Sequence, residues 1–147
     1  MLPTAGRTFR RCLLVFHGAL LLALAGCGSD GEPRHQLSGT INWAGRPVPN
    51  GIIYFDPDIA SGQDGPQGYA TISNGKYDTR AQGLGPGSGK YLFRLYAFNG
   101  VPANELPMGQ PLFPEYSWTE TLPAEDSVKN IEVPASAAAV AYAPAGP

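Results

Sequence analysis

Alternation of apolar and polar residues predicts β-strands through the middle of the chain. Between residues 36 and 133 no stretch shows the three-to-four spacing of an amphipathic helix, and Gly and Pro separate nearly every segment. The clearest strand is Lys90–Phe98, in which every second residue is apolar and suited to a core. These inward positions are Tyr91, Phe93, Leu95 and Ala97. The pattern is typical of an all-β protein.

Five further segments carry strand signals: Leu37–Trp43, Ile52–Phe55, Gly68–Ser73, Lys76–Thr79 and Ser127–Val133. Ile52–Phe55 is apolar throughout, which indicates a strand that is buried on both faces or lies at the centre of a sheet. Asn74-Gly75 is a strong signal for a two-residue hairpin, since both residues tolerate positive φ. About six or seven strands of this kind predict a small antiparallel β-sandwich.

The chain begins with a different pattern, a short apolar run behind basic residues. Cys12–Ala25 is 14 residues long and follows Arg7, Arg10 and Arg11. A membrane-spanning helix needs about 20 apolar residues, whereas a basic segment, a short apolar run and small residues form a secretory signal peptide. We therefore expect residues 1–26 to be a signal peptide and the protein to be exported.

The apolar run ends in Leu24-Ala25-Gly26-Cys27, which resembles the lipobox of bacterial lipoproteins. This resemblance implies that the signal is cut before Cys27, that the thiol accepts a diacylglyceryl group, and that the new amino terminus is acylated, typically with palmitate. Two or three acyl chains anchor a protein stably, so residues 27–35 become a lipidated tether in the cell envelope. Because no Asp follows Cys27, the same resemblance favours the outer membrane in a Gram-negative cell.

Length, charge and cysteine content limit the number of domains and the kinds of partner that we expect for this protein. Without residues 1–26 the chain has 121 residues, enough for one domain and too few for two of ordinary size. It carries seven basic and twelve acidic residues, a formal charge of −5, which argues against nucleic acid as a partner. Cys12 leaves with the signal, so Cys27 has no partner for an internal disulfide. Pro134–Pro147 is uncharged and rich in Ala and Pro, which predicts a disordered tail.

Three segments with a closing IEV resemble the small transthyretin-like (prealbumin-like), or carboxypeptidase-regulatory-like, lipoproteins of planctomycete-type bacteria. They read SGTINWAGRPVPNGIIYFDPD, ISNGKYDTRAQGLGPGSGKYLFRL and PLFPEYSWTETL. The resemblance covers residues 36–133 and implies a prealbumin-like β-sandwich over that range. It implies no activity, because the family has no shared catalytic set. Glu115 stands where a Lys is usual in the family, which leaves the register of the final strand open.

The domain lacks the histidines on which many catalytic sites depend. His17 lies in the signal peptide and His35 in the tether, so none remains for a catalytic triad or a zinc site. Asp56, Asp58 and Asp64 offer oxygen ligands to Ca²⁺, but Asp beside Pro more often ends a strand. We therefore predict no enzyme activity, no cofactor and no metal site, with calcium at these aspartates as the alternative.

Two functions remain open. The first is a non-enzymatic, membrane-anchored envelope lipoprotein whose domain is structural or binds another envelope component, an unknown protein or glycan. The alternative is a carbohydrate- or peptide-binding accessory module. The long connection Asn99–Leu122 bears on this choice, because its aromatic residues Phe113, Tyr116 and Trp118 either close the end of the core or bind a partner. The hypothesis to test is that Tyr116 and Trp118 form a binding surface with Trp118 exposed to solvent.

Overall fold

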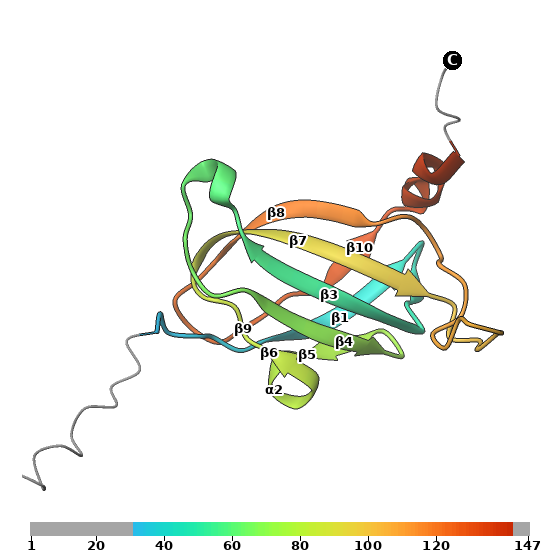
Figure 1. The fold of residues 1–147 in the computed structure, drawn as a ribbon, viewed down its shortest axis with the longest axis horizontal. Coiled ribbons are helices and arrows are strands. Elements are labelled where there is room, and N and C mark those ends of the chain that lie inside the picture. Colours follow the sequence, from blue (N-terminus) through green and yellow to red (C-terminus); the bar gives the residue numbers. More distant parts are fainter. Residues whose placement is uncertain (1–30, 143–147) are drawn as a thin grey trace, which may run out of the picture. The chain divides into compact units, whose positions relative to one another are not determined.

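The computed structural model describes residues 31–142, which form a curled β-sheet with three short helices (Figure 1). The strands are β1 (Leu37–Trp43), β2 (Arg46–Pro47), β3 (Asn50–Pro57), β4 (Gly68–Ser73), β5 (Lys76–Asp78), β6 (Gly83–Leu84), β7 (Gly89–Phe98), β8 (Tyr116–Leu122), β9 (Ser127–Val128) and β10 (Ile131–Val133). The helices are η1 (Ile59–Ser61), α2 (Thr79–Gln82) and η2 (Ala135–Tyr142). The prediction of an all-β fold is confirmed.

The predicted signal peptide and the lipobox Leu24–Cys27 lie outside the described residues. In the part of the chain that the structure describes, no helix is long and apolar enough to cross a membrane.

The sheet runs in the order β10-β1-β5-β4-β3-β7-β8, and β2, β6 and β9 pair with its members as short additions. Every pairing is antiparallel except those of β9 and β10, which run parallel to β1. This departs from a purely antiparallel sandwich. β1, β4 and β7 run in one direction, and β3, β5 and β8 run in the opposite direction. After β8 the chain reverses, so β9 and β10 run in the same direction as β1.

Most predicted strands form as expected. β4 has the predicted bounds, and Asn74 and Gly75 turn the chain into β5 with φ of 50° and 74°, which confirms the hairpin. β3 pairs with β4 on one side and β7 on the other, which confirms its place at the centre of the sheet. Along β7 the four predicted inward residues are all buried.

Two elements differ from the expectation. β8 lies inside the segment expected to be a connection, and it pairs with β7 from Tyr116 to Leu122. The closing strand is divided into β9 and β10, because the side chain of Asn130 replaces a backbone partner there. Its Oδ1 accepts hydrogen bonds from both the backbone nitrogen and the hydroxyl of Thr40, each at 3.0 Å.

The core lies inside the curl of the sheet. Phe55 and Phe93 meet at its centre, with ring centroids 4.9 Å apart and edge-on geometry. Between the two end strands, side chains close the core in place of backbone pairing. Lys129 Nζ lies 2.8 Å from Glu120 Oε2 and joins β8 to the segment between β9 and β10. The sheet is thus barrel-like, with one side sealed by side chains.

Both ends of the predicted domain extend further than the strand signals indicated. Arg34 Nη1 donates to the carbonyls of Gln67 and Gly85, each at 2.7 Å, and the His35 nitrogen donates to Pro86 O at 2.8 Å. The last residues of the expected tether therefore pack on the domain. The expected disordered tail begins with η2, whose Ala137 is buried because its small side chain fits against the core.

The hydrogen bonds of the buried Tyr91 hydroxyl can be tested by removing its single oxygen atom. Its hydroxyl accepts a hydrogen bond from Gly87 N at 2.9 Å and donates one to Pro66 O at 3.1 Å, and the side chain is fully buried. Tyr91→Phe leaves the buried Gly87 N–H without a partner, so we expect the free energy of unfolding to fall by about 1–3 kcal/mol in urea titrations. Tyr69→Phe, at an exposed tyrosine, is the control and should change it by less than about 0.5 kcal/mol. Equal effects of the two substitutions would contradict this account.

Candidate binding surface

The outer face of β4, β3 and β7 carries three tyrosines around an arginine. Because side chains alternate along a strand, the residues between the core positions share the opposite face. The register places Tyr69, Tyr54 and Arg94 next to one another across the three strands, and Tyr96 follows Arg94 on the same face of β7. We call these four residues the tyrosine–arginine surface.

The rings of this surface hold fixed positions relative to one another. The Tyr54 and Tyr96 ring centroids are 6.0 Å apart at an interplanar angle of 84°, and those of Tyr54 and Tyr69 are 6.5 Å apart at 38°. Arg94 Cζ lies 5.3 Å from the Tyr54 ring centroid, within range of a cation–π interaction. A ligand on this face therefore meets aromatic groups that are already arranged.

Two carboxylates hold the arginine. Arg94 Nε lies 2.5 Å from Asp56 Oδ2 and Nη1 lies 4.0 Å from Glu115 Oε2. The hydrogen bond to Asp56 raises the pKa of Arg94 above its usual value, so the guanidinium stays charged. Tyr96 donates its hydroxyl proton to Glu115, and this hydrogen bond, with burial, raises the pKa of Tyr96. One cation with two acidic side chains gives the group a formal charge of −1.

A hollow of about 430 Å³ opens over these residues, lined by Ile52, Tyr54, Arg94, Tyr96, Phe98 and Met108. Small-molecule sites have volumes of about 300–1,000 Å³, so the hollow is large enough for a ligand. Met108 reaches it from the connection between β7 and β8. Asn99 holds that connection in place, since its Oδ1 accepts hydrogen bonds from the backbone nitrogens of Val101 and Gln110.

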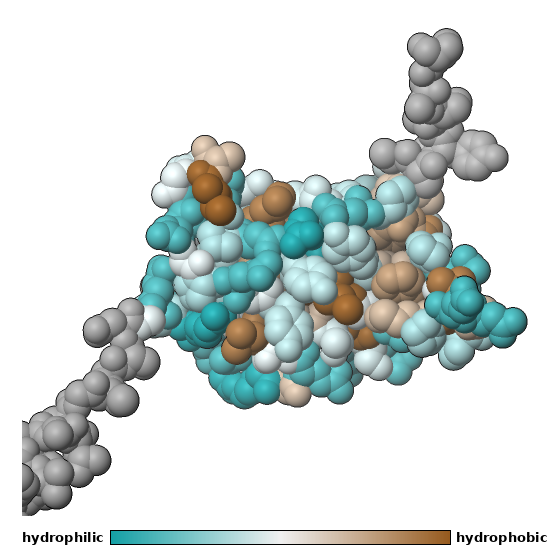
Figure 2. Space-filling view, in the orientation of Figure 1, coloured by the Kyte–Doolittle hydropathy of each residue, from teal (hydrophilic) through white to brown (hydrophobic). Residues whose placement is uncertain are grey.

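Part of the polar lining is free to meet a ligand. Among the hydrogen bonds within residues 31–142, Arg94 uses Nε and Nη1, whereas its Nη2 and the Tyr54 hydroxyl have no partner. Figure 2 shows the surface in the orientation in which β3 and β7 face the viewer, with small apolar areas set among neutral and hydrophilic ones. The face thus combines apolar contact area with unused hydrogen-bonding groups.

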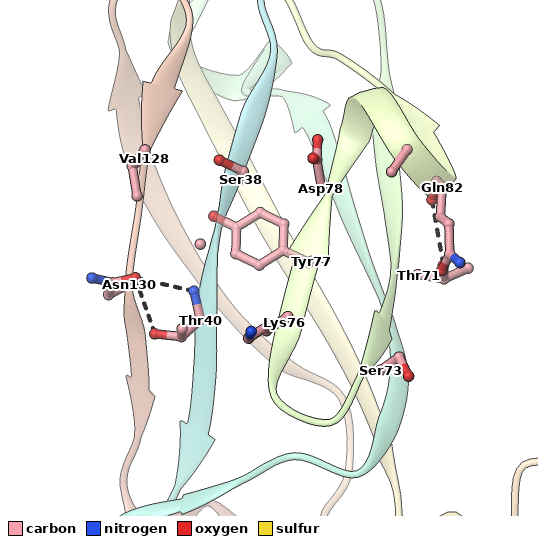
Figure 3. A pocket seen from close by; sticks show the side chains of 12 residues that line it. Ser38, Thr40, Thr71, Ser73, Lys76, Tyr77, Asp78, Gln82, Val128 and Asn130 are labelled. Atoms are coloured by element: carbon pink, nitrogen blue, oxygen red, sulfur yellow. Dashed lines mark hydrogen bonds between the residues drawn. The ribbon is translucent and has the colours of Figure 1, made fainter.

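A second hollow, of about 470 Å³, lies on the outer face of β1 and β5 (Figure 3). Its polar side chains largely bond to one another: the Thr40 hydroxyl donates to Asn130 Oδ1, and the Thr71 hydroxyl to Gln82 Oε1 at 2.7 Å. Asp78 accepts from the Arg80 backbone nitrogen and so caps α2. Although this hollow is the larger, most of its polar groups are occupied in holding the sheet, and its lining residues include no group of neighbouring aromatic rings. We therefore take the tyrosine–arginine surface as the candidate site.

The aromatic residues suggested by the sequence lie elsewhere, on the side of the core between the two end strands. Phe113 is buried, and Trp118 packs on Phe93 with ring centroids 5.1 Å apart. Tyr116 and Trp118 are both partly buried against the core, with their own centroids 5.4 Å apart. Trp118 is therefore half-buried where we expected it to be exposed. The physical reason is that β8 forms there and turns Tyr116 and Trp118 inward.

The three aspartates considered for calcium are engaged separately. Asp56 pairs with Arg94, Asp58 Oδ2 lies 3.1 Å from Lys90 Nζ, and Asp64 Oδ1 accepts from the nitrogen of Gly65 at 2.8 Å. The hydrogen bond with Lys90 lowers the pKa of Asp58. Across residues 31–142 no group of three or more His, Cys, Asp or Glu side chains is placed to hold a metal ion.

Comparison with known proteins finds no match: no family model, curated protein or solved structure resembles this chain closely enough. The likeness to transthyretin-like lipoproteins therefore stays a prediction from the sequence motifs. Support for a function comes instead from the chemistry of the tyrosine–arginine surface.

Proposed function

We propose that this protein is a non-enzymatic, membrane-anchored lipoprotein of the cell envelope that binds an envelope component on the tyrosine–arginine surface. The observation that carries the binding role is the hollow over β3 and β7, which is lined by Tyr54, Tyr96 and the Arg94 that pairs with Asp56. The anchor rests on the sequence Leu24-Ala25-Gly26-Cys27.

The composition of this face supports binding over a purely structural role. Tyr and Arg, together with Trp, are the residues that contribute most often to binding energy, and Tyr supplies broad contact area at a low cost in conformational entropy. The solvated face of a sheet is commonly polar, and here its centre carries Tyr54 and Tyr96 instead. The only histidine in the part of the chain that the structure describes is His35, next to Pro86, outside the hollow, so no histidine base adjoins Tyr54 or Arg94.

The binding role predicts a loss of retention when the rings are removed. Purified full-length protein in detergent is incubated with isolated cell-wall and polysaccharide fractions, and bound protein is measured after sedimentation. We expect the double substitution Tyr54→Ala/Tyr96→Ala to weaken retention at least tenfold, because both rings line the hollow. Thr121→Ala, an exposed position on β8, is the control and should bind like the natural protein. Unchanged retention of the double variant would refute the proposed surface.

The anchor predicts a change in fractionation. Cys27→Ser removes the thiol that would accept the diacylglyceryl group, so we expect an uncut precursor in place of the processed membrane lipoprotein. Mass spectrometry of the natural protein should show a lipid-modified Cys27 at the amino terminus. An unmodified Cys27, or a mature terminus at another residue, would rule out the lipoprotein proposal.

A further inference from the structure

We infer that the ligand of the tyrosine–arginine surface is a neutral oligosaccharide, an inference that rests on the proposed binding role of this surface. It is drawn from three features of the hollow: its ring faces, its balance of donors and acceptors, and the absence of a free backbone edge on β3 and β7.

The apolar lining matches one side of a sugar ring. A pyranose has a face of C–H groups and a rim of hydroxyls, and C–H groups favour the electron-rich face of an aromatic ring. Tyr54 and Tyr96 both line the hollow and stand nearly perpendicular to each other, so a ligand there can contact aromatic groups in two orientations. Ile52, Phe98 and Met108 extend the apolar lining around them.

The polar lining matches the hydroxyl rim. A hydroxyl both donates and accepts hydrogen bonds, so it can use a guanidinium donor and a carboxylate acceptor that lie side by side. Arg94 lines the hollow and offers its unused Nη2. Its partners Asp56 and Glu115 are not lining residues but lie beside the guanidinium, at 2.5 Å and 4.0 Å, and have further lone pairs to accept from a ligand. The Tyr54 hydroxyl, without a partner inside residues 31–142, can do either.

The charge of the group selects against acidic ligands. Arg94 is already matched by Asp56, and Glu115 adds a second carboxylate at 4.0 Å from Arg94 Nη1. An anionic sugar or a phosphate would meet this excess negative charge at close range. A neutral ligand meets no such penalty.

Backbone pairing argues against an extended peptide. Peptides that add to a sheet bind through unpaired backbone groups at an edge strand. Here β3 is paired with β4 and β7, and β7 with β3 and β8, so both strands under the hollow have neighbours on each side. The hollow therefore offers side chains only, which suits a ligand rich in hydroxyls.

The test uses full-length protein in a detergent without a sugar headgroup. Cellotetraose, chitotetraose and maltotetraose are the neutral probes, tetragalacturonate is the acidic probe and tetra-alanine the peptide probe, with binding measured by calorimetry and saturation-transfer NMR. We expect at least one neutral tetrasaccharide to bind with a Kd below about 1 mM, and both other probes to bind at least tenfold more weakly. The Tyr54→Ala/Tyr96→Ala variant should lose this binding at least tenfold.

Tyr96→Leu keeps an apolar side chain on β7 and removes the ring, so it provides a second variant in case the double variant does not fold. It should weaken sugar binding while the thermal midpoint stays close to that of the natural protein. Stronger binding of tetragalacturonate or tetra-alanine, or no binding of any neutral probe, would overturn the neutral-sugar inference. If envelope material were still retained through Tyr54 and Tyr96 in that case, the binding function would stand and only the ligand class would fall.

Discussion

Gly39→Val is expected to lower the free energy of unfolding by about 4 kcal/mol or more, a loss at the upper end for single substitutions. A Cβ at this position would lie 2.0 Å from the carbonyl oxygen of Lys129 and 2.7 Å from its carbon, both backbone atoms. Gly39 also has a φ of 154°, which L side chains rarely adopt. A side chain at position 39 fits only if the segment between β9 and β10 moves. Lys129 O then loses the hydrogen bond that it accepts from the Tyr77 hydroxyl at 2.9 Å.

Equilibrium unfolding in urea measures this loss, and Gly45→Ala separates its two causes. Gly45 has a φ of 73° but nothing within 4 Å of an added Cβ, so its substitution tests conformational strain without a steric clash. We expect about 1–2 kcal/mol at that position. If Gly39→Val proved no worse than Gly45→Ala, the close packing of β1 against Lys129 would be wrong.

Trp118→Ala is expected to cost about 2–4 kcal/mol, somewhat less than full burial of a tryptophan would imply. The ring packs on Phe93 and Tyr116 on the side where side chains close the sheet, so its loss opens a cavity between β8 and the core. Thr119→Ala is the matched control, because the next residue of β8 points outward and is exposed; it should change stability by less than about 0.5 kcal/mol. A loss below about 0.5 kcal/mol for Trp118→Ala would instead support the original hypothesis that Trp118 belongs to a binding surface.

The sequence predicted those strands whose own residues carry a complete signal. Along β7, four buried residues alternate with outward ones. Asn74-Gly75 identifies the hairpin between β4 and β5 without help from distant segments. β8 carries a weaker form of the same signal, because Tyr116, Trp118 and Leu122 alternate with outward Ser and Thr, but the charged Glu120 interrupts the inward positions. Glu120 is tolerated there because Lys129 pairs with it, and that partner comes from a different part of the chain. The division of the closing strand likewise depends on a contact across the sheet, between Asn130 and Thr40.

The candidate surface depends even more on long-range pairing. Asp56 and Arg94 are 38 positions apart, and Tyr69 reaches the same face only through the register of β4 on β3. Alternation alone would have marked Arg94 and Tyr96 as outward residues, whereas Tyr54 lies in a run that is apolar throughout, and the grouping of the three follows from the strand order. The predicted aromatic cluster around Trp118 was recognised as a unit because its members are close in sequence, and its inward orientation followed only from the formation of β8.

The contacts of Arg34 and His35 have a mechanical consequence if, as proposed, a lipid on Cys27 holds the protein. Because these two residues are fixed to Gln67, Gly85 and Pro86, at most the six residues Gly28–Pro33 would separate Cys27 from the domain, a chain length of about 20 Å when extended. A force applied at the anchor would act first on the hydrogen bonds of Arg34 and His35 to the loops around β6, and only then on the hydrogen bonds that pair β1 with its neighbours. Under the proposed anchor, the domain would thus stay close to the membrane, and these hydrogen bonds would resist its detachment.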